Sequence, residues 1–141
     1  MKTILLPLLF TALLSSTLAG PQSVRVLGKF LCHGKPEQFA ELKLVDYGLF
    51  GSTDVDKDKF TDPSGFFELA GTVDSWFNFD AWVYVWHKCY PKEYEHKDPC
   101  WRHIAIKVPK VQIQQSTLPD RTWNMGEFPL DLAKNTDDWC P

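Results

Sequence analysis

The chain has 141 residues, a formal net charge of −3 and a hydrophobic content of 44%. This length suits one domain with one core, and a mildly acidic chain without a basic stripe is a poor candidate for nucleic-acid binding. Beyond the N-terminal segment, no apolar stretch reaches the roughly 18 residues that a membrane-spanning helix needs.

The first residues have the pattern of a secretory signal peptide. Lys2 precedes an apolar run at 4–14, and small and polar residues follow at 15–20. This order of a charged region, an apolar region and a small-residue cleavage site predicts a signal peptide at 1–19. The remaining residues, 20–141, are then one secreted, extracellular domain.

Alternation of apolar and polar residues predicts strands along the rest of the chain. In chain order they cover 24–32, 41–44, 57–61, 66–70, 81–89, 102–108, 111–114 and 128–132. The segment 81–89 has apolar residues on both faces, which is typical of a central strand. Only 72–80 has room for a short helix. Many short strands separated by turns predict an all-β domain, either a sandwich or an open barrel.

Two glycine-containing positions predict local backbone features. Residues 62–65 read Asp-Pro-Ser-Gly, which is the signature of a type I turn. Gly28 lies inside the first predicted strand, where glycine indicates a bulge or a close approach of another backbone.

The four cysteines, Cys32, Cys89, Cys100 and Cys140, all follow the signal peptide. An even number of cysteines in a small exported chain predicts two disulfides, although four cysteines allow three pairings. We expect Cys89–Cys100, which would staple a hairpin and contribute about 3 kcal/mol. Cys32–Cys140 would then tie the tail to the first strand.

Four short motifs follow one another along the chain. They are Val26-x-Gly28-x-x-x-Cys32-x-Gly34-Lys35-Pro36, Thr61-x-x-x-Gly65-x-Phe67-x-Leu69-x-Gly71, His87-x-Cys89, and Cys100-x-Arg102 followed by Ile104 and Ile106. Together they resemble the nematode transthyretin-like family, over nearly the whole secreted chain. The resemblance implies a prealbumin-like β-sandwich of about seven or eight strands with at most one short helix. The Gly- and Asp-rich segment 47–60 departs from the family pattern, and we expect a loop there.

Catalytic motifs do not occur in the sequence. Some transthyretin relatives are 5-hydroxyisourate hydrolases, but their C-terminal Tyr-Arg-Gly-Ser tetrad has no counterpart in residues 135–141. There is also no Gly-x-Ser-x-Gly nucleophile motif and no His-Glu-x-x-His zinc motif. We therefore expect a non-enzymatic protein without catalytic residues.

The histidines fall at predicted strand ends or in the predicted hairpin loop. They are His33, His87, His96 and His103. We expect structural hydrogen-bonding roles for them. The alternative is a zinc site between His87 and His103, which lie on predicted neighbouring strands.

The best candidate metal site is an acidic segment. Asp54, Asp56 and Asp58 alternate along the chain, so an extended segment would place their carboxylates on one side, and calcium prefers several such oxygen ligands. Asp46 or Asp62 would complete the site. The alternative is a solvated loop in which lysines offset the charge.

Leu49 and Phe50 are candidates for contact with a membrane. They lie between Gly48 and Gly51, just before the acidic segment. By analogy with calcium-dependent lipid-binding sandwiches of the C2 type, they would enter the membrane surface while calcium bridges to anionic headgroups. The alternative is that they cover the end of the sandwich or a dimer seam.

The chain contains six tryptophans, which is many for its length. Trp82 and Trp86 alternate with Val83 and Val85 in the strongest predicted strand. We expect core packing for most of the tryptophans, with an aromatic binding strip, a small lipophilic pocket or a symmetric interface as alternatives.

The resemblance implies extracellular recognition. For this family, a role has been proposed in bridging exposed phosphatidylserine on dying cells to an engulfment receptor. We therefore expect an anionic phospholipid surface and a cell-surface receptor as partners, with calcium as the one candidate cofactor. Exposed edge strands and aromatic residues also make a homodimer a reasonable assembly. The alternatives are a carrier of a small lipophilic ligand and, third, a hydrolase of the 5-hydroxyisourate type.

Overall fold

The computed structural model describes residues 20–74, 77–91, 100–134 and, for the backbone alone, 137–139. The predicted signal peptide and Cys140 lie outside the described residues. In the described part of the chain, no helix is long and apolar enough to cross a membrane.

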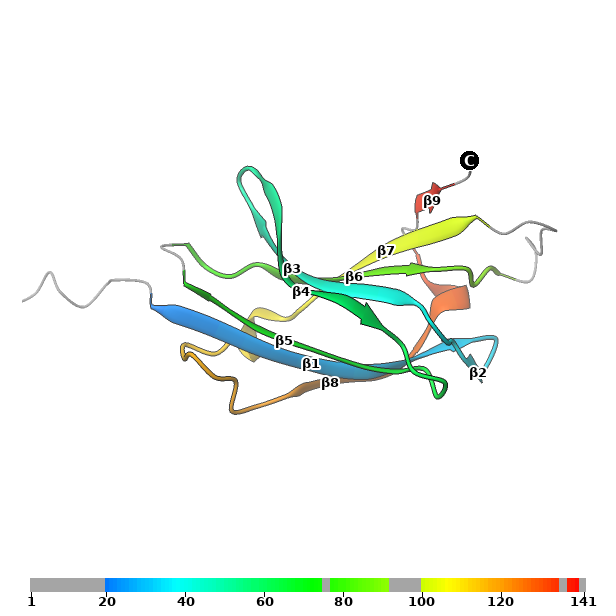
Figure 1. The fold of residues 1–141 in the computed structure, drawn as a ribbon, viewed down its shortest axis with the longest axis horizontal. Helices are drawn as coiled ribbons and strands as arrows, with labels where there is room; N and C mark the ends of the chain where they lie inside the picture. The colour runs from blue at the N-terminus through cyan, green and yellow to red at the C-terminus, as the bar shows by residue number, and fades with distance from the viewer. Residues whose placement is uncertain (1–19, 75–76, 92–99, 135–136, 140–141) are drawn as a thin grey trace, which may run out of the picture.

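Two β-sheets form the fold, which confirms the predicted all-β sandwich (Figure 1). The four-stranded sheet contains β1 (Pro21–Cys32), β2 (Lys35–Pro36), β5 (Phe66–Asp74) and β8 (Trp123–Pro129). The five-stranded sheet has the order β4 (Gly51–Phe60), β3 (Glu41–Gly48), β6 (Ala81–His87), β7 (Trp101–Lys107) and β9 (Asp137–Trp139). Two short 3-10 turns also occur, η3 (Lys110–Gln112) and η4 (Leu130–Leu132).

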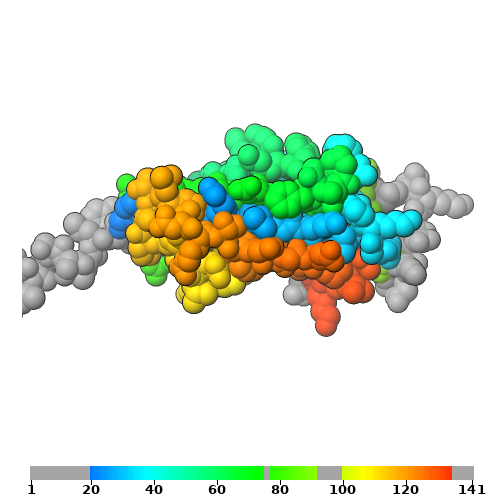
Figure 2. Space-filling model, turned by 90° about the horizontal axis from the view of Figure 1, so that it is seen from below, coloured from blue at the N-terminus to red at the C-terminus, as the bar shows by residue number. Residues whose placement is uncertain are grey.

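Most strand pairs are antiparallel, and β6 lies in the middle of its sheet, as its two apolar faces predict. The pair formed by β1 and β8 is parallel. Figure 2 shows these two strands, blue and orange, side by side on one face of the molecule. The C-terminal part of the chain thus completes the sheet that begins at the N-terminus.

The core lies between the sheets and is built from one face of each strand. Alternate side chains are fully buried, among them Val24, Val26, Leu42, Leu44, Leu69, Val83 and Val85. The ring of Phe30 stacks on that of Phe67, with centroids 4.7 Å apart. A Cβ on Gly28 would lie 3.1 Å from the Phe67 ring, and the pairing of β1 with β8 shifts register here. The irregularity lies at Gly28 as expected, but the extra residue belongs to β8, where Met125 and Gly126 together oppose Gly28, and the close neighbours of Gly28 are side chains rather than another backbone.

The predicted turn at 62–65 is confirmed and connects the two sheets. The Gly65 N–H donates to the carbonyl oxygen of Asp62 at 2.9 Å, as a type I turn requires. The Ser64 hydroxyl, together with the backbone N–H groups of Ser64 and Phe66, donates to the Asp62 carboxylate and holds the pKa of Asp62 below its ordinary value. Gly65 has a φ of +79°, and a Cβ there would lie 2.5 Å from the carbonyl oxygen of Phe30. This position therefore requires glycine.

Three expectations about the path of the chain were wrong. Segment 47–60 is not a loop, because β3 and β4 pair through it as a hairpin. The start of the expected helix at 72–80 is instead part of β5, whose last residue, Asp74, pairs with Pro21. In place of a strand at 111–114, the chain forms η3 and then a single bridge to β1.

Candidate functional site

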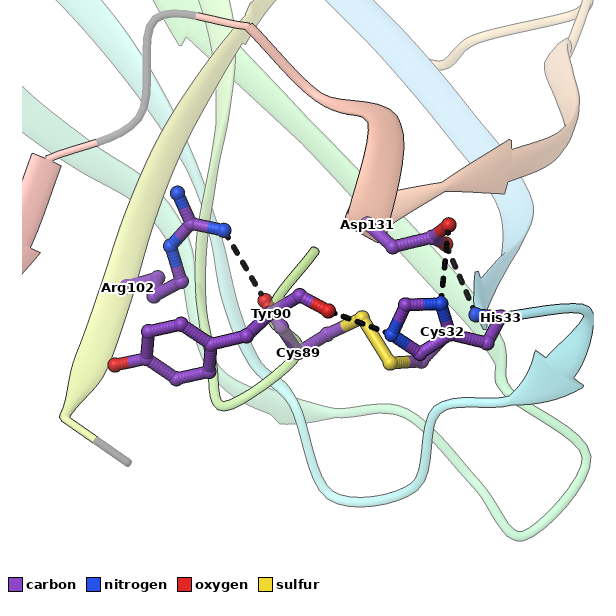
Figure 3. Close-up of polar contacts among 6 residues, drawn as sticks. All are labelled: Cys32, His33, Cys89, Tyr90, Arg102 and Asp131. Carbon is purple, nitrogen blue, oxygen red and sulfur yellow. Dashed lines mark hydrogen bonds and ion pairs between the residues drawn. A yellow bond between two sulfur atoms is a disulfide. The ribbon is translucent and has the colours of Figure 1, made fainter. Parts of the chain in front are cut away.

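One disulfide joins the two sheets at one end of the sandwich (Figure 3). Cys32, the last residue of β1, is bonded to Cys89, which lies two residues after β6, with their Cα atoms 5.7 Å apart. The predicted pairs Cys89–Cys100 and Cys32–Cys140 are therefore wrong, because the ends of β1 and β6 converge from opposite layers. Cys100 is also disulfide-bonded, and Cys140 lies outside the described residues.

His33 links this disulfide to the C-terminal part of the chain (Figure 3). Its backbone N–H donates to Oδ1 of Asp131 at 2.9 Å, and its ring Nδ1 lies 3.4 Å from Oδ2 of the same carboxylate. The other ring nitrogen, Nε2, lies 2.6 Å from the carbonyl oxygen of Tyr90. These contacts hold His33 at a left-handed φ of +50°. Both ring nitrogens thus have partners within the fold, which is the structural role predicted for the histidines.

The motif residues near Cys89 form one structural unit. The Cys89 N–H donates to Nδ1 of the buried His87 at 2.9 Å, and Arg102 donates to the Cys89 carbonyl oxygen at 3.3 Å. The Arg102 guanidinium also lies 5.0 Å from the centroid of the Tyr90 ring. A zinc site shared by His87 and His103 does not fit this arrangement. Strand alternation directs His87 into the core, whereas the His103 ring contacts aromatic rings on the outer face.

Two β-bulges shape β4, and each one shifts the alternation of side chains. In the first, Lys57 and Asp58 together oppose Lys43 of β3, and Asp58 has a φ of +57°. In the second, Val55 is the extra residue, and its side chain lies against Gly71 of β5. A Cβ on Gly71 would collide with Cγ1 of Val55, so this contact requires glycine.

The bulges give the three candidate calcium ligands different surroundings. Asp54 forms an ion pair with Lys43 at 2.8 Å. Asp56 accepts a hydrogen bond from the backbone N–H of Ala70 on β5 at 3.0 Å. Asp58 is exposed at the first bulge. The single row of carboxylates expected from strict alternation therefore does not form.

The described residues do not gather a calcium ligand set around these aspartates. The Asp46 carboxylate accepts a hydrogen bond from the backbone N–H of Asp80 at 3.0 Å. The Asp62 carboxylate accepts hydrogen bonds within the turn at 62–65. In the described part of the chain, one group of three potential ligand atoms lies within 4.8 Å, in Cys32, His33 and Cys89, and its two sulfurs are bonded together. Calcium binding stays a prediction that requires the carboxylates to leave their present partners.

The candidate lipid-contact residues form the tip of the β3–β4 hairpin, which stands clear of the body in Figure 1. Leu49 is 86% exposed and Phe50 is 104% exposed, because they occupy the turn between the paired Gly48 and Gly51. Two further exposed rings lie beside the tip and line a groove of about 490 Å³ with it. We call these four residues the tip patch: Tyr47, Leu49, Phe50 and Phe77.

Aromatic rings also gather on the outer face of the five-stranded sheet. In β6, Val83 and Val85 enter the core, so Trp82 and Trp86 point outward and stay half-buried. These two tryptophans therefore belong to the predicted alternative, an aromatic strip on the surface. Alternation in the sequence predicts that the two tryptophans share one face of β6. It does not predict whether that face lies toward the core or toward the outer surface.

The outer rings contact side chains from neighbouring strands. The Trp86 ring centroid lies 4.8 Å from that of His103 on β7, and Lys43 Nζ of β3 lies 5.4 Å from the Trp86 ring. Trp101, at the start of β7, is 43% exposed on the same face. The sequence pattern gave no signal for the lysine, because its contact depends on the register between β3 and β6.

Known proteins share sequence with most of this chain. The model of the Transthyretin-like family matches residues 27–109. Transthyretin-like protein 1 of Caenorhabditis elegans is 27% identical over 120 residues, covering 80% of this chain and 74% of that protein. Transthyretin-like protein 5 of the same organism is 28% identical over 135 residues, covering 92% of this chain and 91% of that protein. Among solved structures, a 9R-lipoxygenase from Cyanothece matches 77% of this chain and 16% of that chain at a TM-score of 0.42 and 18% identity, too low to support an argument.

Proposed function

The chain belongs to the Transthyretin-like family, and from this premise we propose that it is a secreted, non-enzymatic binding protein that recognises cell surfaces. The tip patch is the proposed lipid-contact site, and exposed phosphatidylserine is its proposed ligand. The body of the sandwich behind the tip is then available to a cell-surface receptor.

The exposure of the hairpin tip is the observation that supports this proposal most strongly. Large contiguous apolar patches on the surface of soluble proteins commonly mark sites that contact a partner or a membrane. The β3–β4 hairpin projects from the body (Figure 1), and Leu49 and Phe50 are the exposed residues of its turn, so both side chains can enter a bilayer surface together. Full burial contributes about 1.5–3 kcal/mol for each such side chain, so removing both should weaken membrane affinity by roughly 100-fold or more.

The charge beside the tip bears on the role of calcium. The groove next to the tip contains one charged residue, Asp46, and no lysine or arginine lines it. An anionic headgroup would be repelled there unless a cation intervenes. This sign of charge is the reason to test calcium together with lipid, with Asp54, Asp56 and Asp58 of β4 as the candidate ligands.

Vesicle co-sedimentation tests the lipid proposal. The mature chain would be mixed with phosphatidylcholine vesicles with and without phosphatidylserine, in calcium or in a chelator. We expect binding to the phosphatidylserine vesicles and a loss of roughly 100-fold in affinity for the Leu49→Ser/Phe50→Ser variant. The matched control is Val111→Ser/Leu118→Ser, which removes two residues that are 75% and 73% exposed outside the tip patch.

Two results would contradict the lipid proposal: no binding by the unaltered chain, or an equal loss in the tip variant and its control. A third result bears on calcium alone. If binding survives both the chelator and the Asp54→Asn/Asp56→Asn/Asp58→Asn variant, the tip contacts lipid without calcium.

The contacts of the cysteine and histidine side chains support the non-enzymatic part of the proposal. Cys32 and Cys89 are bonded to each other, and both ring nitrogens of His33 face acceptor atoms of the fold. We expect 5-hydroxyisourate to decay at the same rate with and without the protein. A rate that rises in proportion to protein concentration would contradict this expectation.

The groove beside the tip also supports a second candidate function, the carriage of a small lipophilic ligand. Its volume of about 490 Å³ lies within the usual range for small-molecule sites, and Tyr47, Leu49, Phe50 and Phe77 line it. A fluorescent fatty-acid analogue that binds the unaltered chain below its micelle concentration, but not the tip variant, would favour the carrier. Binding to vesicles alone would favour membrane contact.

A further inference from the structure

We propose that a groove on the outer face of the five-stranded sheet binds a saccharide, at a site separate from the tip patch. The groove has a volume of about 400 Å³, which is within the usual range for small-ligand sites. It lies over β3, β4, β6 and β7, and it shares no lining residue with the groove at the hairpin tip. Variants of the tip patch therefore leave this groove unaltered, whereas two of the candidate calcium ligands, Asp54 and Asp58, line it.

Two tryptophans give the groove aromatic surface. Trp86 lies directly opposite His103 in the β6–β7 register, and Trp101 precedes His103 by two residues, so the two indoles are diagonal neighbours on one face. Lys88 approaches the Trp101 ring at 4.8 Å, but it is not a groove residue. The rings of pyranose sugars present C–H groups on their faces, and these pack favourably on the negative face of an aromatic ring.

Charged side chains of both signs surround the tryptophans. Lys43 and Asp54 form a 2.8 Å ion pair in the groove, and Glu41, Lys57 and Asp58 also line it. Paired charges produce little net field, but an ammonium keeps unused donors and a carboxylate keeps unused acceptor sites. A sugar hydroxyl both donates and accepts hydrogen bonds, so it can bond to either partner of such a pair.

The first bulge of β4 places two of these charged residues at the groove. Because Lys57 and Asp58 together oppose Lys43, a second acidic and a second basic side chain lie beside the ion pair. Bulges commonly redirect side chains next to binding sites. Asp58 has a φ of +57°, a conformation that few non-glycine residues adopt.

The composition of the groove disfavours other ligands. Five of its eight lining residues are charged, so a lipophilic ligand would remove charged groups from water without satisfying them. The cores of protein–protein interfaces are depleted of Lys, Glu and Asp, which are the majority here. A simple anion would be repelled by the three carboxylates of this site, those of Glu41, Asp54 and Asp58. A neutral polyhydroxylated ligand with one apolar face fits all of these features.

Titration of the mature chain with soluble oligosaccharides tests this proposal. The probes are the N-acetylglucosamine trimer, cellotriose and maltotriose, followed through the indole N–H signals in proton–nitrogen NMR spectra. We expect at least one probe to shift the Trp86 and Trp101 signals in a saturable way. Trp101→Ala and Asp58→Gly should each weaken that binding at least tenfold, and glycine suits the left-handed backbone at position 58.

Two control variants separate this groove from its surroundings. Lys107→Ala removes a cation that lies 5.7 Å from the Trp82 ring on the same face but outside the groove, and Leu49→Ser/Phe50→Ser alters only the tip. Both should bind the saccharide like the unaltered chain. The proposal is overturned if no probe shifts the two signals, if Trp101→Ala and Asp58→Gly both bind normally, or if phosphocholine shifts the signals and no saccharide does.

Discussion

Loss of the Cys32–Cys89 bridge should remove a large part of the stability of the domain. The bridge joins residues separated by 57 positions, for which the chain-entropy model gives about 4 kcal/mol. The hairpin bridge Cys89–Cys100 expected from the sequence would close a much shorter loop and contribute only about 3 kcal/mol. A single domain has a total unfolding free energy of roughly 5–15 kcal/mol, so the loss should be plain.

Urea unfolding of the Cys32→Ala/Cys89→Ala variant measures this loss. For a slope of about 2 kcal/mol/M, the midpoint should fall by roughly 2 M relative to the unaltered chain. Peptide mapping without reduction provides a check that does not depend on folding, since a fragment containing Cys32 should be linked to one containing Cys89. A loss below about 1 kcal/mol, or a fragment in which Cys89 is linked to Cys100, would refute the reasoning.

Three further predictions concern stability. In urea unfolding, Gly65→Ala should destabilise the domain by clearly more than Gly34→Ala. The two glycines have nearly the same φ, +79° and +77°, but only at Gly65 would the added Cβ lie 2.5 Å from a backbone oxygen, that of Phe30. Equal losses of stability in the two variants would contradict this. Phe30→Ala should cost about 3–5 kcal/mol, since its fully buried ring packs on two other rings, and a loss under 1.5 kcal/mol would show that the site collapses. The hydrogen bonds from Ser64 lower the pKa of Asp62 in the folded state, so their stabilisation is present above the unfolded pKa and is lost as pH falls through the folded one. Thermal unfolding of Asp62→Ala should therefore depend less on pH in the acid range than that of the unaltered chain, and parallel pH profiles would count against this.

Regular alternation allowed much of the fold to be predicted from the sequence. The strand β6 was recognised as central because apolar residues occur on both of its faces, and it does lie in the middle of its sheet. The turn at 62–65 was recognised because Asp, Pro and Gly each have a specific geometric role in it. Both signals are local, so they can be read without knowing which strands become neighbours.

Features that depend on neighbouring strands could not be predicted. Segment 47–60 contains glycines and aspartates, which are poor strand formers, and its residues 51–60 form β4 only because β3 offers a partner along their length. The bridge between Cys32 and Cys89 depends on where the two layers converge. Loop length along the chain gives no information about that convergence.

In the candidate sites, too, local sequence features were predicted and features that depend on strand pairing were not. Leu49 and Phe50 were singled out because glycines flank them, and that local pattern does produce an exposed tip. The row of three aspartates was inferred from strict alternation, which holds only in a strand without bulges. The groove with Trp86 combines residues from four strands, so the sequence singled out its tryptophans and two of its aspartates, Asp54 and Asp58, but not their meeting in one site.

The contact between β4 and β5 has a consequence for how copies of this chain can associate. Each of these strands lies at the edge of its sheet, and exposed edges are where other chains add strands and aggregates begin. In this structure Val55 of β4 packs against Gly71 of β5, and the backbone N–H of Ala70 in β5 donates to the Asp56 carboxylate of β4. The two edge strands therefore shield each other. Association of two copies through a continuous sheet is therefore disfavoured along this side. A dimer formed on this side would have to use the sheet faces or the hairpin tip, and the closed edge is protected against fibril growth.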